Sequence, residues 1–427
     1  MSQKILIISE SIDVEDSSGS KANVALIRNL RKAGFELRVY HYTRREVQWD
    51  DIDCVSIEEN RRSLLFLLSR TERYLRYIFK IRLNKTLERL FGFSFTLLND
   101  RNSIITALRN SNDFKPDLVL TLSKGGSFRP HHALLGLPEF HDKWMAYIHD
   151  PYPMHWYPPP YPWFEPGYHQ KEDFMKNVAS RCTITAFPSK ILMEWMGSKF
   201  EEFKKKGVVI PHQIDHENQP KASQLLAKDL VVKPEKFTVL HAGNLIQGRE
   251  PFGLLEGFRE FLSQSEEARQ SAELVFIGGE NYYSDILNEF EREVSQFKNS
   301  KEKLDFDTVQ VLQHNASVNI ILEAKSEISP FLPGKFPHCI AANKKILLLG
   351  PPNSESRRLL GFEYPYWSEI DDKRKITLLL SELFENWKKD KASMELNRPD
   401  LEEYLSVNQL SKTMDSIFQP KKEESHE

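Results

Sequence analysis

The sequence has few cysteines, no long apolar run and almost no net charge. Its three cysteines, Cys54, Cys182 and Cys339, lie far apart among 427 residues. This number and spacing exclude a disulfide framework and a zinc cluster, and favour a reducing compartment. The apolar run near the start, within MSQKILIISE, is four residues long, and no run of eighteen apolar residues follows. We therefore expect no signal peptide, no transmembrane helix and a cytoplasmic location.

The charge balance excludes a general affinity for nucleic acid or anionic lipid. Lys and Arg number 58 against 61 Asp and Glu, so the net charge is -3. Any charged partner must therefore be recognised locally. The length of the chain predicts two domains, and the polar composition between Pro211 and Glu235 predicts a linker between them.

The chain opens with a strand, a helix and a second strand, over Lys4–Ile8, Lys21–Ala33 and Glu36–His41. Gly19 and Ser20 stand directly before the helix, where backbone groups can reach a ligand. Their spacing is not the GxGxxG dinucleotide fingerprint. A ligand role and an ordinary turn both stay open for this loop.

Three further strands are predicted in the first half, over Asp117–Leu122, Trp144–His149 and Cys182–Phe187. We expect them to join a parallel sheet, in which ligands lie beyond the carboxyl ends of the strands. Residues 123–126 (SKGG) and the pair His149 and Asp150 occupy such positions. The alternative for His149 is a structural histidine bonded to a backbone partner.

The loop Pro151–Pro166 (PYPMHWYPPPYPWFEP) has seven prolines and six aromatic residues. This composition excludes regular helix and central strand. A rigid loop with aromatic faces suits recognition of a sugar or lipidic acceptor. It suits equally well a rigid cover over an apolar core.

The segment Arg61–Leu98 has nine Arg or Lys against two Glu, interleaved with aromatic and aliphatic residues, for a local charge of about +7. A basic amphipathic helix of this kind can lie on an anionic membrane surface. It can also be a pair of helices packed on a sheet. Nucleic acid is not expected as a partner, because no recognised binding motif accompanies the charge.

The stretch from Ser329 to Asn353 reads as a rigid loop, a short helix and a buried strand. Gly334 lets the backbone approach a ligand, Lys335 supplies a cation, and Pro337 suits a first helical turn. The helix is expected to end near Asn343. Phosphate is the natural ligand for such a loop. The alternative is a tight connection with an exposed lysine.

A second α/β domain is predicted after the linker. Its expected strands are Phe237–His241, Leu274–Gly279 with the glycine turn Gly278-Gly279, Thr308–Leu312 and Ile346–Leu349. The first of these leads into the sequence AGNLIQGREPFGLLEGF.

The two Rossmann-like halves, the glycine-containing loop after the first strand, the AGNLIQGRE motif and the PGK loop together resemble the GT-B glycosyltransferases, specifically the family-4 retaining group. The resemblance covers most of the chain and implies two facing α/β domains with a cleft between them. It also implies a last helix that returns to the first domain. We accordingly expect domains at 1–211 and 212–400, a returning helix at 401–418 and a disordered tail at 419–427.

The resemblance also implies roles for individual residues. Arg249 and Lys335 match the cations that hold the donor diphosphate, and His149 matches the histidine that contacts the donor sugar. The expected donor-binding residues are Gly243, Asn244, Gly278, Gly279, Gly334, His338, Ser354 and Glu355. The expected acceptor-binding residues are Gly19, Ser20 and Asp150.

One departure from the family concerns two glutamates, eight residues apart, of which the second binds the nucleotide ribose. Pro330 and His338 stand at these places here. Histidine can hydrogen-bond a hydroxyl, though not as a bidentate acceptor. Glu355 can substitute for the second glutamate or be a solvated surface residue.

The sequence and the resemblance thus predict an α/β protein that transfers a sugar from a nucleotide-diphosphate donor to a glycan or glycolipid, with retention and without a metal. Two alternatives stay open. One is a nucleotide-sugar epimerase on the same fold, and the other is a non-catalytic glycosyltransferase-like subunit. Contact with the inner face of a membrane would occur through Arg61–Leu98.

Overall fold

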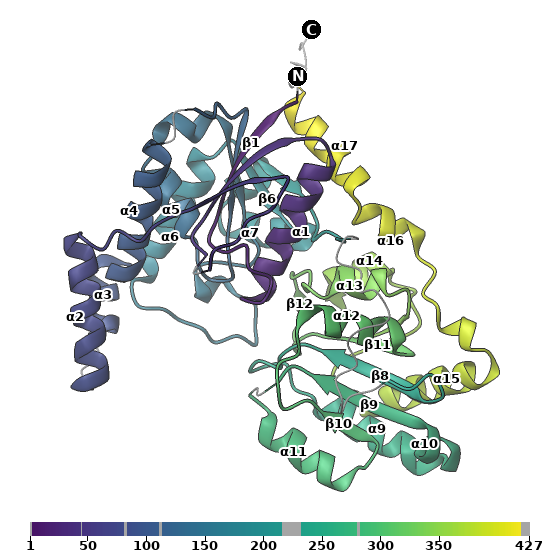
Figure 1. Cartoon of the computed structure of the whole chain (residues 1–427). Helices are drawn as coiled ribbons and strands as arrows, with labels where there is room; N and C mark the ends of the chain where they lie inside the picture. The colour runs from purple at the N-terminus through teal and green to yellow at the C-terminus, as the bar shows by residue number, and fades with distance from the viewer. Residues whose placement is uncertain are drawn as a thin grey trace. The chain divides into compact units, whose positions relative to one another are not determined.

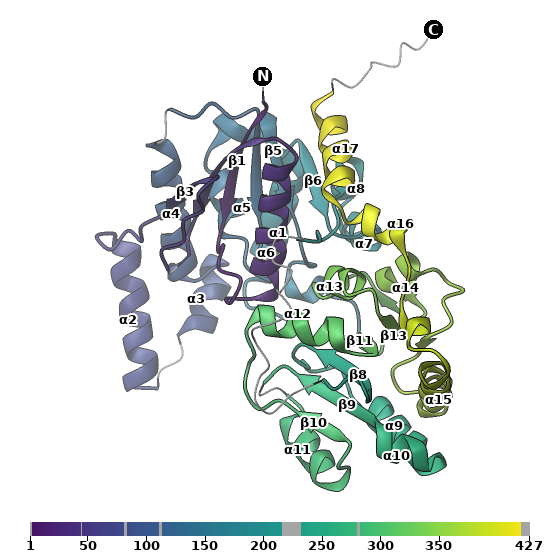
Figure 2. The same cartoon turned by 45° about the vertical axis from the view of Figure 1, so that its right-hand side comes forward.

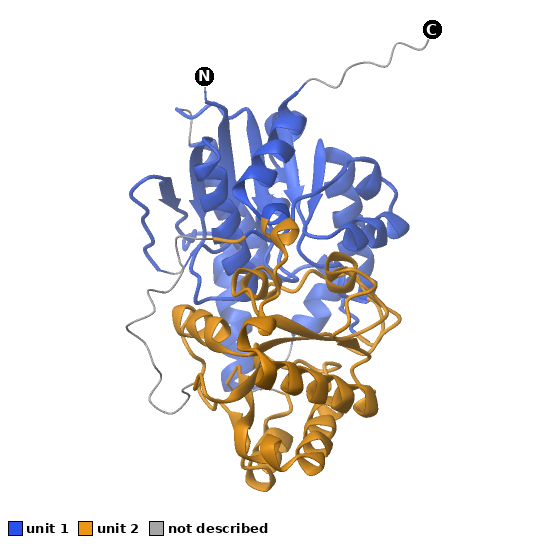
Figure 3. Ribbon diagram, turned by 90° about the vertical axis from the view of Figure 1, so that its right-hand side faces the viewer, with its two compact units in different colours: residues 1–157, 163–213, 403–427 blue, residues 158–162, 214–402 orange. Residues whose placement is uncertain are grey.

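The computed structural model describes residues 2–43, 45–80, 83–110, 113–215, 232–279 and 282–419. The chain forms two compact units, coloured blue and orange in Figure 3. Unit 1 comprises residues 1–157, 163–213 and 403–427, and unit 2 comprises residues 158–162 and 214–402. The proline-rich loop therefore contributes a short segment to unit 2. Most of the predicted linker and of the predicted tail lies outside the described residues.

Unit 1 is built on a seven-stranded parallel sheet in the order β3-β2-β1-β4-β5-β6-β7. Its strands are β1 (Lys4–Ser9), β2 (Glu36–His41), β3 (Asp53–Ser56), β4 (Leu118–Leu122), β5 (Trp144–Tyr147), β6 (Ile184–Phe187) and β7 (Gly207–Val209). The order is that of a Rossmann sheet. From β1 the strands are added first toward one edge of the sheet, as β2 and β3, and then toward the other edge, beginning with β4, so the strand order reverses between β1 and β4. The parallel sheet predicted from the apolar runs is confirmed.

The helices of unit 1 are α1 (Ser18–Lys32), α2 (Leu64–Ile78), α3 (Asn84–Phe91), α4 (Phe95–Arg109), α5 (Arg129–Leu135), α6 (Tyr168–Arg181), α7 (Lys190–Lys199), α8 (Glu202–Lys205) and α17 (Val407–Phe418). Helix α1 begins where the Ser17 side chain accepts a hydrogen bond from the backbone N–H of Ser20. Such a cap satisfies an otherwise unpaired donor of the first turn.

The last described helix belongs to unit 1, as expected for the returning helix, although the residues before it belong to unit 2. Helix α17 packs against α1, and Figures 1 and 2 show the two side by side. The Phe35 and Phe418 rings lie 5.8 Å apart. The single helix predicted over 401–418 is in fact two helices, α16 (Pro399–Tyr404) and α17. They are separate because Ser406 caps α17 through its side chain.

Unit 2 repeats this topology. Its main sheet is parallel, with the order β10-β9-β8-β11-β13-β15. The strand order reverses between β8 and β11. The strands are β8 (Phe237–Ala242), β9 (Ala272–Ile277), β10 (Phe297–Asn299), β11 (Val318–Leu322), β13 (Lys345–Leu349) and β15 (Trp367–Ser368), with β12 (Ile328–Ser329) pairing separately with β14 (Asn353–Ser354). The two parallel sheets confirm the predicted α/β fold class.

The helices of unit 2 are α9 (Phe252–Gln264), α10 (Glu266–Ser271), α11 (Ser284–Glu293), α12 (Phe306–Asn315), α13 (Phe336–Ala341), α14 (Glu355–Leu360) and α15 (Lys373–Lys389). The strand predicted at Thr308–Leu312 is wrong, because these residues belong to α12. The Asp305 side chain accepts from the backbone N–H of Thr308 and starts a helix there. The prediction missed β11, which pairs with β8 and β13 in the middle of the sheet, and the shorter strands β10, β12, β14 and β15.

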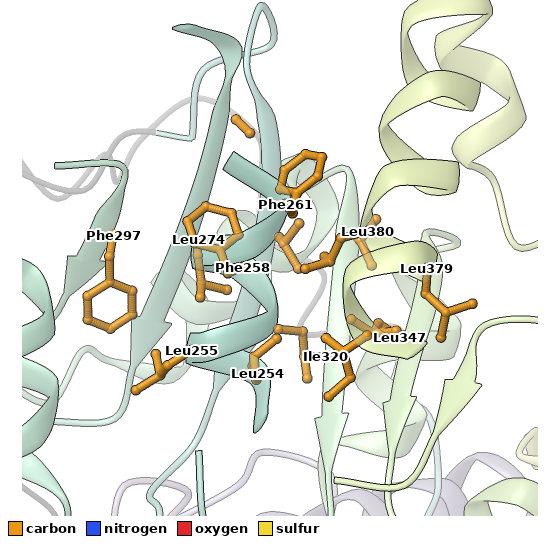
Figure 4. Close-up of a cluster of buried hydrophobic side chains, with 14 of the residues drawn as sticks. Leu254, Leu255, Phe258, Phe261, Leu274, Phe297, Ile320, Leu347, Leu379 and Leu380 are labelled. Atoms are coloured by element: carbon orange, nitrogen blue, oxygen red, sulfur yellow. The ribbon is translucent and has the colours of Figure 1, made fainter. Parts of the chain in front are cut away.

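An aromatic and aliphatic core fixes the sheet of unit 2. Figure 4 shows Phe258 and Phe261 of α9 and Leu380 of α15 directed toward Leu274 and Leu347 of the strands. All five are buried. Truncating one such side chain to alanine typically costs about 2–5 kcal/mol. The loops at the strand ends are therefore carried by a rigid scaffold.

Candidate functional site

A cluster of basic groups occupies the carboxyl-terminal edge of the unit 2 sheet. His241 lies near the end of β8, and Lys335 directly precedes α13. The amino group of Lys335 is 3.0 Å from Nε2 of His241. Burial lowers the pKa of Lys335 to about 7. The pKa of His241 lies well below its usual range, because of burial first and then the charges of Lys335 and Arg249.

Arg249 completes this cluster. Its charge also lowers the pKa of Lys335, so the two cations are near each other although 86 residues separate them in sequence. Its Nε is buried and, within the described ranges, has no hydrogen-bond partner. The structure therefore brings Lys335, His241 and Arg249 together at the point where the strand order reverses, which is where ligands bind in open α/β sheets.

A pocket opens beside this cluster. It is lined by Pro159, Tyr161, Arg249, Glu323, Ala324, Ser326, Ile328, Ser329, Phe331 and Pro333. The Tyr161 and Phe331 rings lie 6.3 Å apart in an edge-to-face arrangement. Arg249 and Glu323 supply its charged groups.

Glu323 is a candidate site residue that the sequence reasoning missed. It directly follows β11 and is 3% exposed. The Ser356 hydroxyl donates a hydrogen bond to its Oε1. Burial raises the pKa of Glu323 to about 7, opposed in part by Ser356, Ser329 and Arg249. The signal in the sequence was a glutamate placed directly after the apolar run VNIIL, a run that was not recognised as a strand.

At three of the positions predicted to bind the donor, the structure shows why the residue is glycine. A Cβ on Gly243 would lie 3.0 Å from Nζ of Lys335, and one on Gly278 would lie 2.6 Å from the Gly243 carbonyl oxygen. Gly279 has a φ of +69°. Glycine at these positions lets the backbone pass close to the basic cluster. Asn244 is exposed on the same loop, and Gly334 directly precedes Lys335 in a turn.

The structure excludes one alternative that the sequence left open for each of two charged residues. Lys335 is not an exposed loop lysine, because its side chain is half-buried and its amine lies 3.0 Å from His241. Glu355 is not a solvated glutamate, since it is fully buried and both carboxylate oxygens accept from Arg358, at 2.7 and 3.0 Å. Ser354 caps α14 through its side chain. His338 packs edge-on against Phe306, with ring centroids 5.0 Å apart.

The corresponding edge of unit 1 is organised around His149. Its ring lies 2.6 Å from Oδ1 of Asn23 and 3.2 Å from Nε2 of His212. Asn23 donates through Nδ2 to the Ser123 carbonyl, so its Oδ1 accepts the proton of His149 Nε2. Burial, followed by neighbouring histidines, lowers the pKa of His149 well below its usual range. His149 is therefore a neutral ring with both nitrogens engaged.

The other predicted residues of unit 1 lie around the same strand ends. A Cβ on Gly19 would lie 3.6 Å from the Lys124 Cα, so α1 begins close to the loop after β4. Ser20 is fully buried, and its hydroxyl is 2.9 Å from that of Ser17. Asp150 is half-buried. The structure thus gathers Gly19, Lys124 and His149 by way of neighbouring loops.

The proline-rich loop fits both interpretations of its sequence. Tyr152 and Trp156 are buried in the apolar core of unit 1, as expected for a cover. Pro159 and Tyr161 belong to unit 2 and line its pocket. The carbonyl of Pro159 accepts a hydrogen bond from Ser326. One loop therefore contributes to a core and to a pocket wall.

Comparison by sequence gives no match, either to a protein-family model or to a curated protein. Comparison of structures gives many. The trehalose-6-phosphate synthase OtsA matches with a TM-score of 0.66 at 10% identity, covering 97% of this chain and 98% of that chain. A glycosyltransferase from Rickettsia africae matches with 0.62 at 11% identity, covering 97% of each. Anabaena HepE, solved with UDP and glucose, matches with 0.61 at 10%, covering 97% and 99%.

The chain has the GT-B fold. At these identities the likeness establishes the architecture, with two Rossmann-like sheets in one chain. The roles of individual residues therefore depend on the geometry of this chain.

Proposed function

We propose that the protein is a glycosyltransferase that moves a sugar from a nucleoside-diphosphate sugar to a hydroxyl of a glycan or glycolipid. The observation that carries this proposal is the cluster of Lys335, His241 and Arg249 at the reversal point of the unit 2 sheet. The half-buried amine of Lys335 lies 3.0 Å from a histidine rather than a carboxylate, and the buried Nε of the nearby Arg249 has no hydrogen-bond partner among the described residues. A diphosphate would supply the anion for both.

In this proposal the cations act on the leaving group. The acceptor oxygen forms a bond to the anomeric carbon while the bond from that carbon to the diphosphate breaks. The acceptor proton passes to a diphosphate oxygen on the same face, which gives retention. Negative charge grows on the diphosphate during this step, so Lys335 and Arg249 stabilise the transition state more than the ground state. These cations take the place of a metal ion.

Glu323 gives the pocket a carboxyl group, whereas this chain has Pro330 and His338 at the places where the family has two glutamates. With a pKa of about 7, it can donate or accept a hydrogen bond near neutral pH. The aromatic faces of Tyr161 and Phe331 suit the apolar face of a sugar ring. We therefore assign Glu323 to contact with hydroxyls of the donor.

Product analysis tests this function directly. The full chain is incubated with UDP-glucose, GDP-mannose or ADP-glucose, with and without glycan and glycolipid acceptors. Release of the nucleoside diphosphate that depends on acceptor supports transfer. Isomerised donor without acceptor would identify an epimerase, and absence of both turnover and nucleotide binding would identify a non-catalytic subunit.

The proposal places the protein in the cytoplasm, with the acceptor at or near the inner face of a membrane. Among the described residues, no helix is long and apolar enough to cross a bilayer. Contact with a membrane would therefore be peripheral, and the segment Arg61–Leu98 is its proposed location.

A further inference from the structure

Helix α2 directs its most apolar face away from the protein. Leu64, Leu67, Tyr74 and Ile78 are 69%, 62%, 59% and 60% exposed. Spacings of three, seven and four residues place these side chains on one face of a helix. Ser69 is the only buried residue of α2, all of which is described. The usual pattern of a surface helix, apolar inside and polar outside, is therefore inverted.

The exposed apolar surface continues beyond α2. Phe79 follows the helix and is 57% exposed, and Leu90 and Phe91 at the end of α3 are 67% and 53% exposed. Figures 1 and 2 both show α2 at the outer margin of unit 1, and its inner side contacts α4. Monomeric soluble proteins rarely expose so much apolar surface in one region unless something binds it.

Positive charge borders this apolar surface. Two of its arginines are neutralised, Arg70 by Glu59 and Arg76 by Glu72. Four other cations are not paired with any carboxylate of the described residues, namely Arg73, Lys80, Lys85 and Arg89. The segment as a whole carries nine basic and two acidic residues in a chain of net charge -3. Positive charge is thus concentrated where the apolar stripe is exposed.

We infer that α2 and α3 lie in the interface of an anionic lipid bilayer, with the apolar stripe of α2 among the acyl chains and the unpaired cations at the headgroups. A second copy of this chain is a poor occupant, because two segments of about +7 would repel each other. A nucleic acid would satisfy the cations and leave the stripe exposed to water. An anionic bilayer satisfies both.

This inference sharpens the membrane contact proposed for Arg61–Leu98 by naming the inserted face, and it does not depend on the transfer reaction. Vesicle binding reports on α2, whereas stabilisation by a nucleoside diphosphate reports on unit 2. A protein that does not bind vesicles can still be stabilised by a nucleoside diphosphate, and the reverse also holds. The two measurements therefore test the membrane contact and the transfer reaction separately.

Co-sedimentation of the full chain with vesicles tests the inference. Wild type should bind vesicles of phosphatidylcholine and phosphatidylglycerol, and bind vesicles of phosphatidylcholine alone much more weakly. The triple variant Leu67→Gln, Tyr74→Gln, Ile78→Gln should weaken binding by roughly 10- to 100-fold, because the variant removes most of the inserted apolar area. A charge variant with Arg73, Lys80, Lys85 and Arg89 changed to glutamine should weaken it by about 10²-fold and abolish its salt dependence.

Matched controls lie on unit 2. Leu378 and Phe362 are also exposed, at 69% and 59%, so changing both to glutamine removes apolar surface elsewhere. Changing Lys298, Lys301, Lys373 and Lys389 to glutamine removes the same charge elsewhere. Both controls should bind vesicles like wild type. Because Leu67, Tyr74 and Ile78 are exposed, the triple variant should unfold at the same temperature as wild type.

A second measurement covers the case in which a multiple variant misfolds. The single change Tyr74→Trp places a reporter on the stripe, and its fluorescence should shift to the blue and be quenched by brominated lipid. Tryptophan fluorescence unchanged by anionic vesicles, vesicle binding equal in all variants, or self-association of wild type that the triple variant loses would each overturn the inference.

Discussion

The two sheets have the same strand order, yet their carboxyl-terminal edges handle charge in opposite ways. In unit 1 the charges at this edge are paired, since Lys124 lies 2.5 Å from Asp16 and Arg129 bonds Glu10 and Asp100 at 2.6 and 2.7 Å. In unit 2 the charge of Arg249 lowers the pKa of Lys335, and neither cation forms an ion pair with a carboxylate of the described residues. This difference is what the proposed diphosphate site in unit 2 requires.

The unit 1 edge suits a different ligand. His149 is neutral and bonded on both ring nitrogens, and the cations Lys124 and Arg129 are paired with carboxylates. A surface of this kind has no unpaired cation to hold a phosphate. It suits an uncharged, hydroxyl-bearing acceptor better than a diphosphate.

The largest expected effect concerns Lys335. Lys335→Ala should lower kcat by roughly 10² to 10³ fold, about 3 to 4 kcal/mol, by analogy with removal of a preorganised oxyanion donor. Arg249→Ala should act similarly, and the double variant should be less than additive because both contact one diphosphate. Steady-state kinetics measure these effects, with Lys344→Ala as the control. Unimpaired transfer by Lys335→Ala would show that the two edges do not differ in function.

Lys335→Ala should lower activity without lowering the free energy of unfolding. Burial lowers the pKa of Lys335 to about 7 from a usual value of 10.5, so the charged form is disfavoured in the folded state. Removing the amine should therefore leave the free energy of unfolding unchanged or raise it. Denaturant unfolding at pH 7 checks this, and a clear destabilisation would indicate a structural role for the lysine.

Glu323 gives the next largest effect. Its pKa is about 7 in the folded protein, above the usual 4.5, so the folded state holds a proton that the unfolded chain releases between these values. This group therefore costs stability increasingly as the pH rises through that window. Glu323→Gln should raise the free energy of unfolding at pH 8 by roughly 1 to 3 kcal/mol and change little at pH 4. Denaturant unfolding at both pH values measures the difference; an equal change at both would contradict this assignment.

The next prediction concerns His149, at the edge of the unit 1 sheet. His149→Ala should lower turnover about tenfold or more and destabilise unit 1 by about 1 to 3 kcal/mol, because Asn23 loses a buried hydrogen bond. The affinity for a nucleoside diphosphate should stay unchanged. Calorimetric titration alongside kinetics separates the two, and Asn23→Ala breaks the same contact while keeping the ring. Nucleotide affinity that falls with turnover would place His149 in the donor site.

The sequence predicted the repeated architecture well and the electrostatics poorly. Apolar runs such as those at β1 and β4 have lengths and flanks that identify buried parallel strands. The run at Thr308–Leu312 alternates like a strand, but the Asp305 cap makes it helical. A cap is a local signal that periodicity alone overlooks.

Burial of charged residues could not be predicted in this way. Glu355 becomes buried because Arg358 is one helical turn away, and a sequence read without its folded context treats such a pair as solvated. Lys335 is half-buried, and Gly243, 92 residues earlier, leaves room for its amine. Contacts between distant segments decide the charge state of both residues.

The smallest expected effect is a proton taken up on binding. At pH 8 the free Lys335 amine, with a pKa of about 7, is mostly neutral, and a bound diphosphate should restore its charge. Affinity for UDP or its counterpart should thus fall as the pH rises above 7, by at most tenfold per pH unit. Titration calorimetry in two buffers of different ionisation enthalpy measures the uptake. Lys335→Ala should show no uptake.

The most direct test of the central claim is thermal unfolding of the full chain with UDP, GDP, ADP or CMP. The account predicts that one nucleoside diphosphate stabilises wild type, by about 2.7 kcal/mol at a hundred times its dissociation constant. The Lys335→Ala, Arg249→Ala double variant should fold and show no such stabilisation at the same concentration. Equal stabilisation of wild type and double variant, or no stabilisation of wild type by any of these nucleotides, would contradict a diphosphate site at the unit 2 edge.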